Sequence, residues 1–91
     1  MKEEMNDAVR KQRFQELVQE RIEQLRIENR ETYYTLSYKS TLPMTTLMHI
    51  MDGSTQNPGA YTIMKICDGL GITLKEFFDT KEFEEVVKEC D

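Results

Sequence analysis

Long apolar runs are absent from this sequence. A membrane-spanning helix needs about 20 consecutive apolar residues, and no stretch of the 91 residues approaches that length. The N-terminal segment MKEEMNDAVRK lacks the apolar stretch that a signal peptide requires. A hydrophobic fraction of 38% beside a charged fraction of 32% also excludes an intrinsically disordered chain. We therefore expect one globular domain that is located in the cytoplasm and has no membrane partner.

Cysteine and histidine are scarce. The chain has two cysteines, Cys67 and Cys90, and a single histidine, His49, with no CxxC pair, so we expect neither a metal site nor another cofactor. His49 has no serine, cysteine or carboxylate partner at a recognisable catalytic spacing, and we expect no enzyme activity. Cys67 lies in an apolar stripe, which predicts a free thiol packed in the core. A Cys67–Cys90 disulfide is the alternative, which a reducing compartment disfavours.

Positive charge is in short supply, since the net charge is −5. The imbalance is uneven along the chain: residues 1–31 carry 7 basic and 8 acidic side chains, and residues 32–58 carry one of each. Residues 59–91 carry 4 basic against 8 acidic side chains. The total argues against a nucleic-acid partner, but the local field decides binding. The surplus of acid lies toward the C-terminus, which weakens that argument without removing it.

Helical periodicity and capping signals account for most of the chain. An amphipathic helix from residue 6 or 7 to about 29 is indicated by one apolar stripe: Phe14, Leu17, Val18, Ile22 and Leu25. Further helices are predicted over residues 33–40, 44–51, 60–70, 74–78 and from 81 onward. Three of them follow a capping residue, namely Thr32, the Thr73–Glu76 capping box and Thr80. The other two end before a glycine, Gly53 or Gly71. No segment reads as a strand. The fold class is therefore predicted to be all-α, with five or six short helices.

A family resemblance rests on these same segments. LSYKSTLPMTTLMHIMDG, from Leu36 to Gly53, followed by NPGAYTIMKICDGLGITLKEFF, resembles the Xre-type (Cro and phage-repressor-like) helix-turn-helix DNA-binding family. The match extends over roughly residues 21–78 without a gap. It implies a compact five-helix domain over residues 14–79, with residues 1–13 as an N-terminal extension of the first helix. Residues 80–91 would add a C-terminal amphipathic helix.

The resemblance implies where DNA would bind. The helix 44–51 would lie in the major groove and read base edges with Met44, Thr45, Met48 and His49. Phosphates would be contacted by the start of the preceding helix, by its lysine and by the following loop: Thr32, Tyr33, Lys39, Ser54, Thr55, Gln56 and Asn57. The alternative for Tyr33 is packing against the first helix.

Three departures from the family pattern concern this region. Thr41 occupies a turn position that is often glycine, which strains the turn. Met51 stands where the family often has a glutamate that pairs with the arginine at Arg26, so Arg26 must pair with Asp52, Glu28 or solvent, and Met51 should pack inward. The helix 44–51 also lacks the Arg, Gln and Asn side chains that make two-pronged contacts to guanine or adenine.

Two functions from different classes are consistent with these residues. The first is a sequence-specific transcriptional regulator, a repressor from a bacterium or its phage, that reads duplex DNA through thymine methyl groups and DNA shape. The second is a protein-interaction module, antirepressor-like or a toxin–antitoxin partner, with weak or no DNA binding. Exposed methionines suit either partner, because they can contact thymine methyl groups or form an adaptable apolar surface for a protein.

The last predicted helix has an apolar face that must be buried against another surface. Its members are Phe83, Val86, Val87 and Cys90. The face either folds back on the start of the first helix, near Met5, Val9 and Phe14, or pairs with a second copy of the chain. Because repressors of this kind usually bind as dimers, we expect a homodimer built partly from this face.

Overall fold

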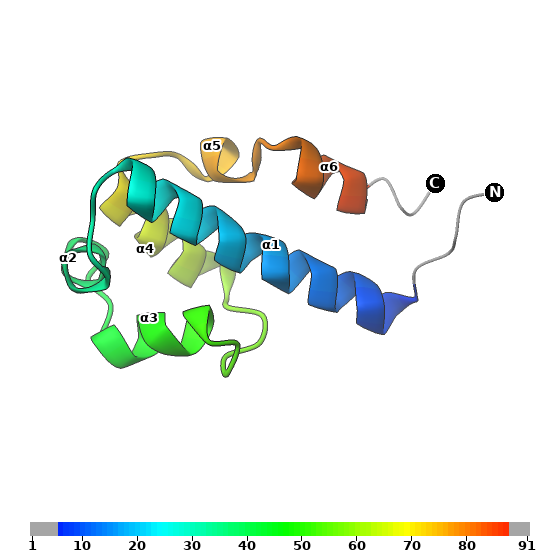
Figure 1. Cartoon of the computed structure of the whole chain (residues 1–91), viewed down its shortest axis with the longest axis horizontal. Coiled ribbons are helices and arrows are strands. Elements are labelled where there is room, and N and C mark those ends of the chain that lie inside the picture. The colour runs from blue at the N-terminus through cyan, green and yellow to red at the C-terminus, as the bar shows by residue number, and fades with distance from the viewer. Residues whose placement is uncertain (1–5, 88–91) are drawn as a thin grey trace.

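Six helices make up the computed structural model, which describes residues 6–87 and holds no strand within that range. Figure 1 shows a long α1 lying across the molecule, with α3 on one side of it and α5 and α6 on the other. The all-α fold class is confirmed. Within residues 6–87, no helix is long and apolar enough to cross a membrane. The helix bounds are α1 (Asp7–Glu28), α2 (Tyr33–Lys39), α3 (Met44–Met51), α4 (Ala60–Leu70), α5 (Leu74–Phe78) and α6 (Lys81–Val87).

The helix ends follow the capping residues that the sequence offers. The Asn6 side chain accepts a hydrogen bond from the Val9 amide at 2.8 Å and starts α1. The Thr73–Glu76 capping box is formed, and α4 ends at Gly71 with φ 74°, in the left-handed region that glycine tolerates. The Thr80 hydroxyl accepts from the Phe83 amide at 3.3 Å at the start of α6. These predicted boundaries are confirmed.

The core is one cluster that every helix enters. Its fully buried side chains come from α1, α2, α3, α4 and α5, and α6 adds two more; the set includes Ile22, Leu36, Leu47, Ile66, Phe77, Phe83 and Val86. Cys67 is a free cysteine buried in this cluster, as predicted. Burial raises the pKa of its thiol to about 11, so the thiol stays protonated at neutral pH.

Side chains of α1 hold the C-terminal ends of two other helices. The guanidinium of Arg21 donates hydrogen bonds of 2.7 Å to the carbonyl oxygens of Glu76 and Phe77, at the end of α5. The guanidinium of Arg10 donates to the Val86 carbonyl at 3.2 Å and to the Val87 carbonyl at 3.4 Å, at the end of α6. Carbonyls in the last turn of a helix lack partners within the helix, and a cation there is favourable.

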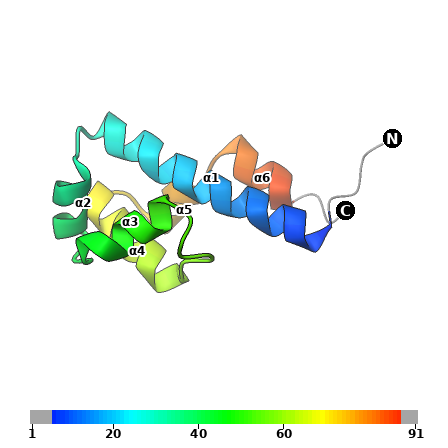
Figure 2. The same cartoon turned by 60° about the horizontal axis from the view of Figure 1, so that its bottom comes forward.

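The apolar face of α6 folds back on α1, which is the first of the two alternatives that the sequence left open. Figures 1 and 2 both show α6 beside the N-terminal half of α1. Phe83 and Val86 are buried there, and the Phe83 ring lies 5.6 Å from the ring of Phe14. Phe83 and Val86 are therefore covered within the chain, and their contact with a second copy stays a prediction. Val87 remains 63% exposed, and Cys90 lies outside the described residues.

Helices α2 and α4 approach closely at Gly69, a feature that no sequence signal indicated. A Cβ at position 69 would lie 2.2 Å from Ser40 Oγ, 3.0 Å from the Ser40 amide nitrogen and 3.2 Å from Leu36 Cδ1. Within the part of the chain that the structure describes, Ser40 Oγ is buried without a hydrogen-bond partner. Glycine is required here because the end of α2 occupies the space that any side chain would fill.

We predict that Gly69→Ala lowers the free energy of unfolding by about 1–2 kcal/mol, because overpacking outweighs the gain in helix propensity. The double variant Gly69→Ala, Ser40→Ala should recover part of the loss, since it removes the hydroxyl at 2.2 Å. Ser40→Ala alone should be neutral or stabilising, because it removes a buried, unpaired oxygen. Urea denaturation of the four proteins measures this. A more stable Gly69→Ala protein, as helix propensity alone would give, would contradict the prediction.

Candidate nucleic-acid interface

Helix α3 presents one face to the core and another to solvent. Leu47 and Ile50 are buried, at 0% and 1% exposure, and hold the helix against the domain. On the outer face Thr45 and His49 are exposed, Met44 is 39% exposed, and Met48 is half-buried. Figure 1 shows α3 along the lower edge of the molecule, on the side of α1 away from α5 and α6. The four predicted reading residues therefore lie on one helix, and three of them are exposed.

The turn before α3 has an unusual backbone conformation. Thr41 has φ 53°, in the left-handed region where a β-branched residue is strained, as its replacement of a turn glycine predicted. Its hydroxyl donates to the carbonyl of Ser40 at 2.6 Å, and the Leu42 amide donates to the Ser37 carbonyl at 3.0 Å. These bonds fix the angle at which the chain leaves α2 and enters α3.

The end of α3 is held by a residue that sequence reasoning missed. The side-chain amide of Gln19, on α1, donates a hydrogen bond of 3.1 Å to the Ile50 carbonyl. After the helix, the Asp52 carboxylate accepts from the Ser54 amide at 2.7 Å, and Gly53 turns the chain with φ 86°. Hydrogen bonds from Ser54 hold the pKa of Asp52 below its usual value. Because Gln19 is 31 residues away in sequence, no local signal could reveal this contact.

Arg26 pairs with Glu23, and the expected partners Asp52 and Glu28 are wrong. The Arg26 guanidinium makes a two-pronged contact to the Glu23 carboxylate, at 2.6 and 3.1 Å, and lies 4.2 Å above the centre of the Tyr33 ring. The Tyr33 hydroxyl donates to the same carboxylate at 2.5 Å. The Arg26 hydrogen bond, followed by that of Tyr33, lowers the pKa of Glu23. The i,i+3 spacing of Glu23 and Arg26 was the signal that could have found this pair.

The contacts between Arg26, Glu23 and Tyr33 bear on two expectations, one for Tyr33 and one for Met51. Tyr33 packs against α1 through Glu23 and Arg26, as the alternative for this residue proposed, so its hydroxyl already has an acceptor. Met51 is half-buried and packs against the core, as predicted. The methionine therefore replaces a charged side chain without leaving Arg26 unpaired.

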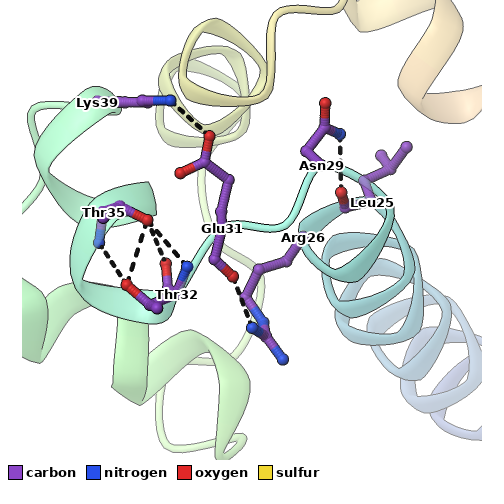
Figure 3. A network of polar contacts seen from close by, with 7 residues as sticks. All are labelled: Leu25, Arg26, Asn29, Glu31, Thr32, Thr35 and Lys39. Carbon is purple, nitrogen blue, oxygen red and sulfur yellow. Dashed lines mark hydrogen bonds and ion pairs between the residues drawn. The ribbon is translucent and has the colours of Figure 1, made fainter.

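The other phosphate candidates surround α3 on both sides. Figure 3 shows the Lys39 ammonium bonded to the Glu31 carboxylate, at 2.6 Å, and the Thr32 hydroxyl accepting from the Thr35 amide, at 3.0 Å, as the cap of α2. The Lys39 bond is the main reason why the pKa of Glu31 is lowered. In the loop after α3, Ser54, Gln56 and Asn57 are exposed and Thr55 is half-buried.

Few cations lie near this surface. Lys39 is the one lysine or arginine between residues 32 and 58, and its side chain is already paired. Hydroxyl, amide and methyl groups dominate the outer face of α3 and the loop that follows it. Such a surface can approach DNA through hydrogen bonds and methyl contacts, with little neutralisation of phosphate charge.

Comparison with known families agrees with this geometry. Residues 21–82 match the family model described as the Cro/C1-type HTH DNA-binding domain, which covers α2 and α3 completely and most of the core. No curated protein and no solved structure matches the chain significantly.

We predict that Thr41→Gly raises the free energy of unfolding by about 0.5–1 kcal/mol. Glycine removes the conformational strain of a β-branched residue in the left-handed region. This gain exceeds the additional backbone entropy that glycine loses on folding. For a domain of this size the midpoint of thermal unfolding should rise by roughly 2–8 °C. Thr41→Ala is the matched control, because it keeps a Cβ in the left-handed region and should gain less than glycine. Equal midpoints for the glycine and alanine variants would show that Thr41 is unstrained.

The acid stability of the domain should depend on Glu23. A carboxylate whose pKa is lowered on folding stabilises the protein above its ordinary pKa of 4.5, and that contribution is lost as the pH falls through the folded-state pKa. We predict that Glu23→Gln is less stable at pH 7 by about 0.5–1 kcal/mol, the range for a partly exposed pair. Its stability should also fall less steeply below pH 4.5. Tyr33→Phe should show an intermediate slope, measured by denaturation at several pH values; identical slopes for all three proteins would contradict the assignment.

Proposed function

The chain belongs to the Cro/C1-type helix-turn-helix family of DNA-binding domains, and we propose that it is a sequence-specific transcriptional repressor from a bacterium or its phage. The proposal places α3 in the major groove of duplex DNA. The observation that carries it is the outer face of α3, where Thr45 and His49 are exposed beside Met44 while Leu47 and Ile50 anchor the helix. A protein that regulates transcription in this way acts in the cytoplasm.

The chemistry of this face favours A·T-rich sites. The methyl group of Thr45 and the side chains of Met44 and Met48 can contact thymine methyl groups, which only A·T pairs present in the major groove. The Thr45 hydroxyl and the His49 imidazole each supply one hydrogen bond to a base edge. Without two-pronged contacts to guanine or adenine, the remaining specificity comes from DNA shape.

Phosphate contacts are proposed from both sides of α3. Thr32 and Tyr33 at the start of α2, with Lys39 at its end, form one side, and the loop Ser54, Thr55, Gln56 and Asn57 forms the other. Lys39 and Tyr33 must exchange an acceptor within the chain for a phosphate oxygen, since Glu31 and Glu23 hold them in the free domain. Few charges are therefore neutralised, and the salt dependence of binding should be shallow.

We further propose that the chain binds as a homodimer, with half-sites about 34 Å apart on one face of the duplex. Burial of Phe83 and Val86 within the chain leaves a smaller apolar surface for that interface. Val87, at the end of α6, is its exposed member.

The alternative is a protein-interaction module that uses the same helix. Two observations favour it: the net charge is −5, and the single lysine of the proposed DNA surface is paired with Glu31. The apolar side chains of Met44 and Met48 would then contact a protein partner, an antirepressor target or a toxin, in place of thymine methyl groups.

We predict that selection from a randomised duplex library at roughly 100 mM salt enriches a two-fold symmetric, A·T-leaning site. The double variant Thr45→Ala, His49→Ala should lose the enrichment while its thermal unfolding stays unchanged, because both residues are exposed. Thr45→Ser is the matched control: it keeps the hydroxyl and removes the methyl group, so it should weaken binding only at sites with a thymine opposite that methyl.

The outcomes separate the two functions. No enrichment by the folded wild-type chain, together with loss of a protein complex in Met44→Glu or Met48→Glu, would establish the interaction module. Enrichment with a salt slope that corresponds to about eight or more phosphates would contradict the proposed apolar mode of reading. Enrichment of a single, unsymmetric half-site would contradict the homodimer.

A further inference from the structure

A cavity of about 360 Å³ lies between the middle of α1, the start of α4 and α5. Its walls are the apolar side chains of Phe14, Val18, Ile63 and Phe78, with Gln15 and Asn57 as polar members. The volume is at the lower end of the range for small-molecule sites, which is about 300–1,000 Å³. None of the described side chains that line it carries a charge. A charged ligand would find no counter-charge there, and the cost of removing its water would be uncompensated.

The Gln15 side chain is the observation that points to a ligand. Gln15 is only 9% exposed, and it lines this cavity. Among residues 6–87 its side-chain amide makes no hydrogen bond to another residue, and its polar atoms keep some contact with solvent. The neighbouring glutamines on α1 are paired: Gln12 donates to Glu16 at 3.0 Å, and Gln19 donates to the Ile50 carbonyl. An amide at the wall of a cavity that has no partner in the protein can donate a hydrogen bond to a ligand and accept one from it.

We propose that this cavity binds a small, uncharged, mainly apolar molecule that carries one hydrogen-bonding group, such as a hydroxyl. The apolar part occupies the space between Phe14, Val18, Ile63 and Phe78, and the polar group bonds to the amide of Gln15. Binding also covers Phe14 and Leu74, two cavity residues that are 37% and 39% exposed in the free chain. Covering exposed apolar surface provides most of the affinity, and the amide selects the orientation.

The cavity is adjacent to the loop that leads from α3 to α4. Asn57, Pro58 and Ala60 line it, and Asn57 is also one of the proposed phosphate contacts. A molecule in the cavity therefore touches the segment that would lie against the DNA backbone. If the ligand prefers one loop conformation, it changes the affinity for DNA, and DNA changes the affinity for the ligand by the same factor. This coupling rests on the proposed function, whereas ligand binding itself does not.

The test uses two probes that differ by one group, 2-naphthol and naphthalene. Each is added to the full chain without DNA, and the methyl NMR signals of Val18 and Ile63 are followed. Both probes should shift these signals to saturation at one molecule per chain, with 2-naphthol bound about 2- to 10-fold more tightly because its hydroxyl bonds to Gln15. Gln15→Leu should abolish that difference and leave naphthalene binding in place. Gln12→Leu is the matched control on the exposed side of α1 and should change neither affinity.

A second variant tests the volume of the cavity. Ala60→Phe adds an aromatic ring to a lining position that is also exposed, so the chain should fold and the binding of both probes should be lost. The proposal is overturned if saturating probe leaves the Val18 and Ile63 signals of the folded wild-type chain unmoved. Equal affinities for the two probes in the wild-type chain would also overturn it, because Gln15 would then have no role. So would a stoichiometry of one probe per two chains with probe-induced dimers, which would identify a second copy as the occupant.

The coupling between ligand binding and DNA binding is tested in a separate experiment. Saturating 2-naphthol should change the affinity of the chain for the selected duplex. The duplex should change the affinity of the chain for 2-naphthol by the same factor. A chain that binds the probe but no DNA would leave the cavity assignment standing and overturn the proposed function alone.

Discussion

Side chains of α1 donate hydrogen bonds to the carbonyl ends of three later helices, and the arrangement of the fold depends on them. Gln19 bonds to the end of α3, Arg21 to the end of α5, and Arg10 to the end of α6. Arg26 adds a bond of 2.7 Å to the Glu31 carbonyl, which precedes α2 (Figure 3). Short helices of five to eight residues are unstable alone, and their last carbonyls need partners. One long helix supplies them, so α1 sets the position of each short helix as well as burying its apolar face.

In this arrangement the contacts that hold α3 in the fold involve different residues from those on its outer face. Leu47 and Ile50 fix its inner face, the hydrogen bond from Gln19 fixes its end, and the turn at Thr41 fixes its start. None of these contacts uses Thr45 or His49. The outer face can therefore change its chemistry without loss of the fold. A surface of methionine, threonine and histidine on a Cro/C1-type scaffold is consistent with that freedom, because the side chains of Thr45 and His49 make none of the contacts that hold α3.

The elements of the fold could be predicted from the sequence, and the contacts between them could not. Helix bounds follow signals that span four residues or fewer, such as the Asn6 cap, the Thr73–Glu76 box and the left-handed turn at Gly71. The resemblance to the family also placed the candidate reading residues on α3, because a helix depends on residues that are close together in the sequence. The bond from Gln19 spans 31 residues and those from Arg21 span 55 and 56. Such bonds depend on how the helices pack, which leaves no period or spacing in the sequence. Gly69 and the cavity beside Gln15 belong to the same class, because each arises only when separate helices meet.

The same packing explains how an acidic chain can retain a DNA-binding fold with so few free cations near α3. Arg10, Arg21 and Arg26 satisfy carbonyls and carboxylates of the domain itself, and Lys39 is bonded to Glu31. These four cations are engaged within the domain, so they are less available to neutralise phosphate. In the proposed mode of binding the electrostatic part of DNA affinity would then be small, and the contacts of α3 and of the loop after it would form a larger share of the total. A modest shift of the loop at Asn57 would then change a large fraction of the free energy of binding to DNA. A ligand in the proposed site beside this loop would therefore alter DNA binding more than it would at a strongly basic interface.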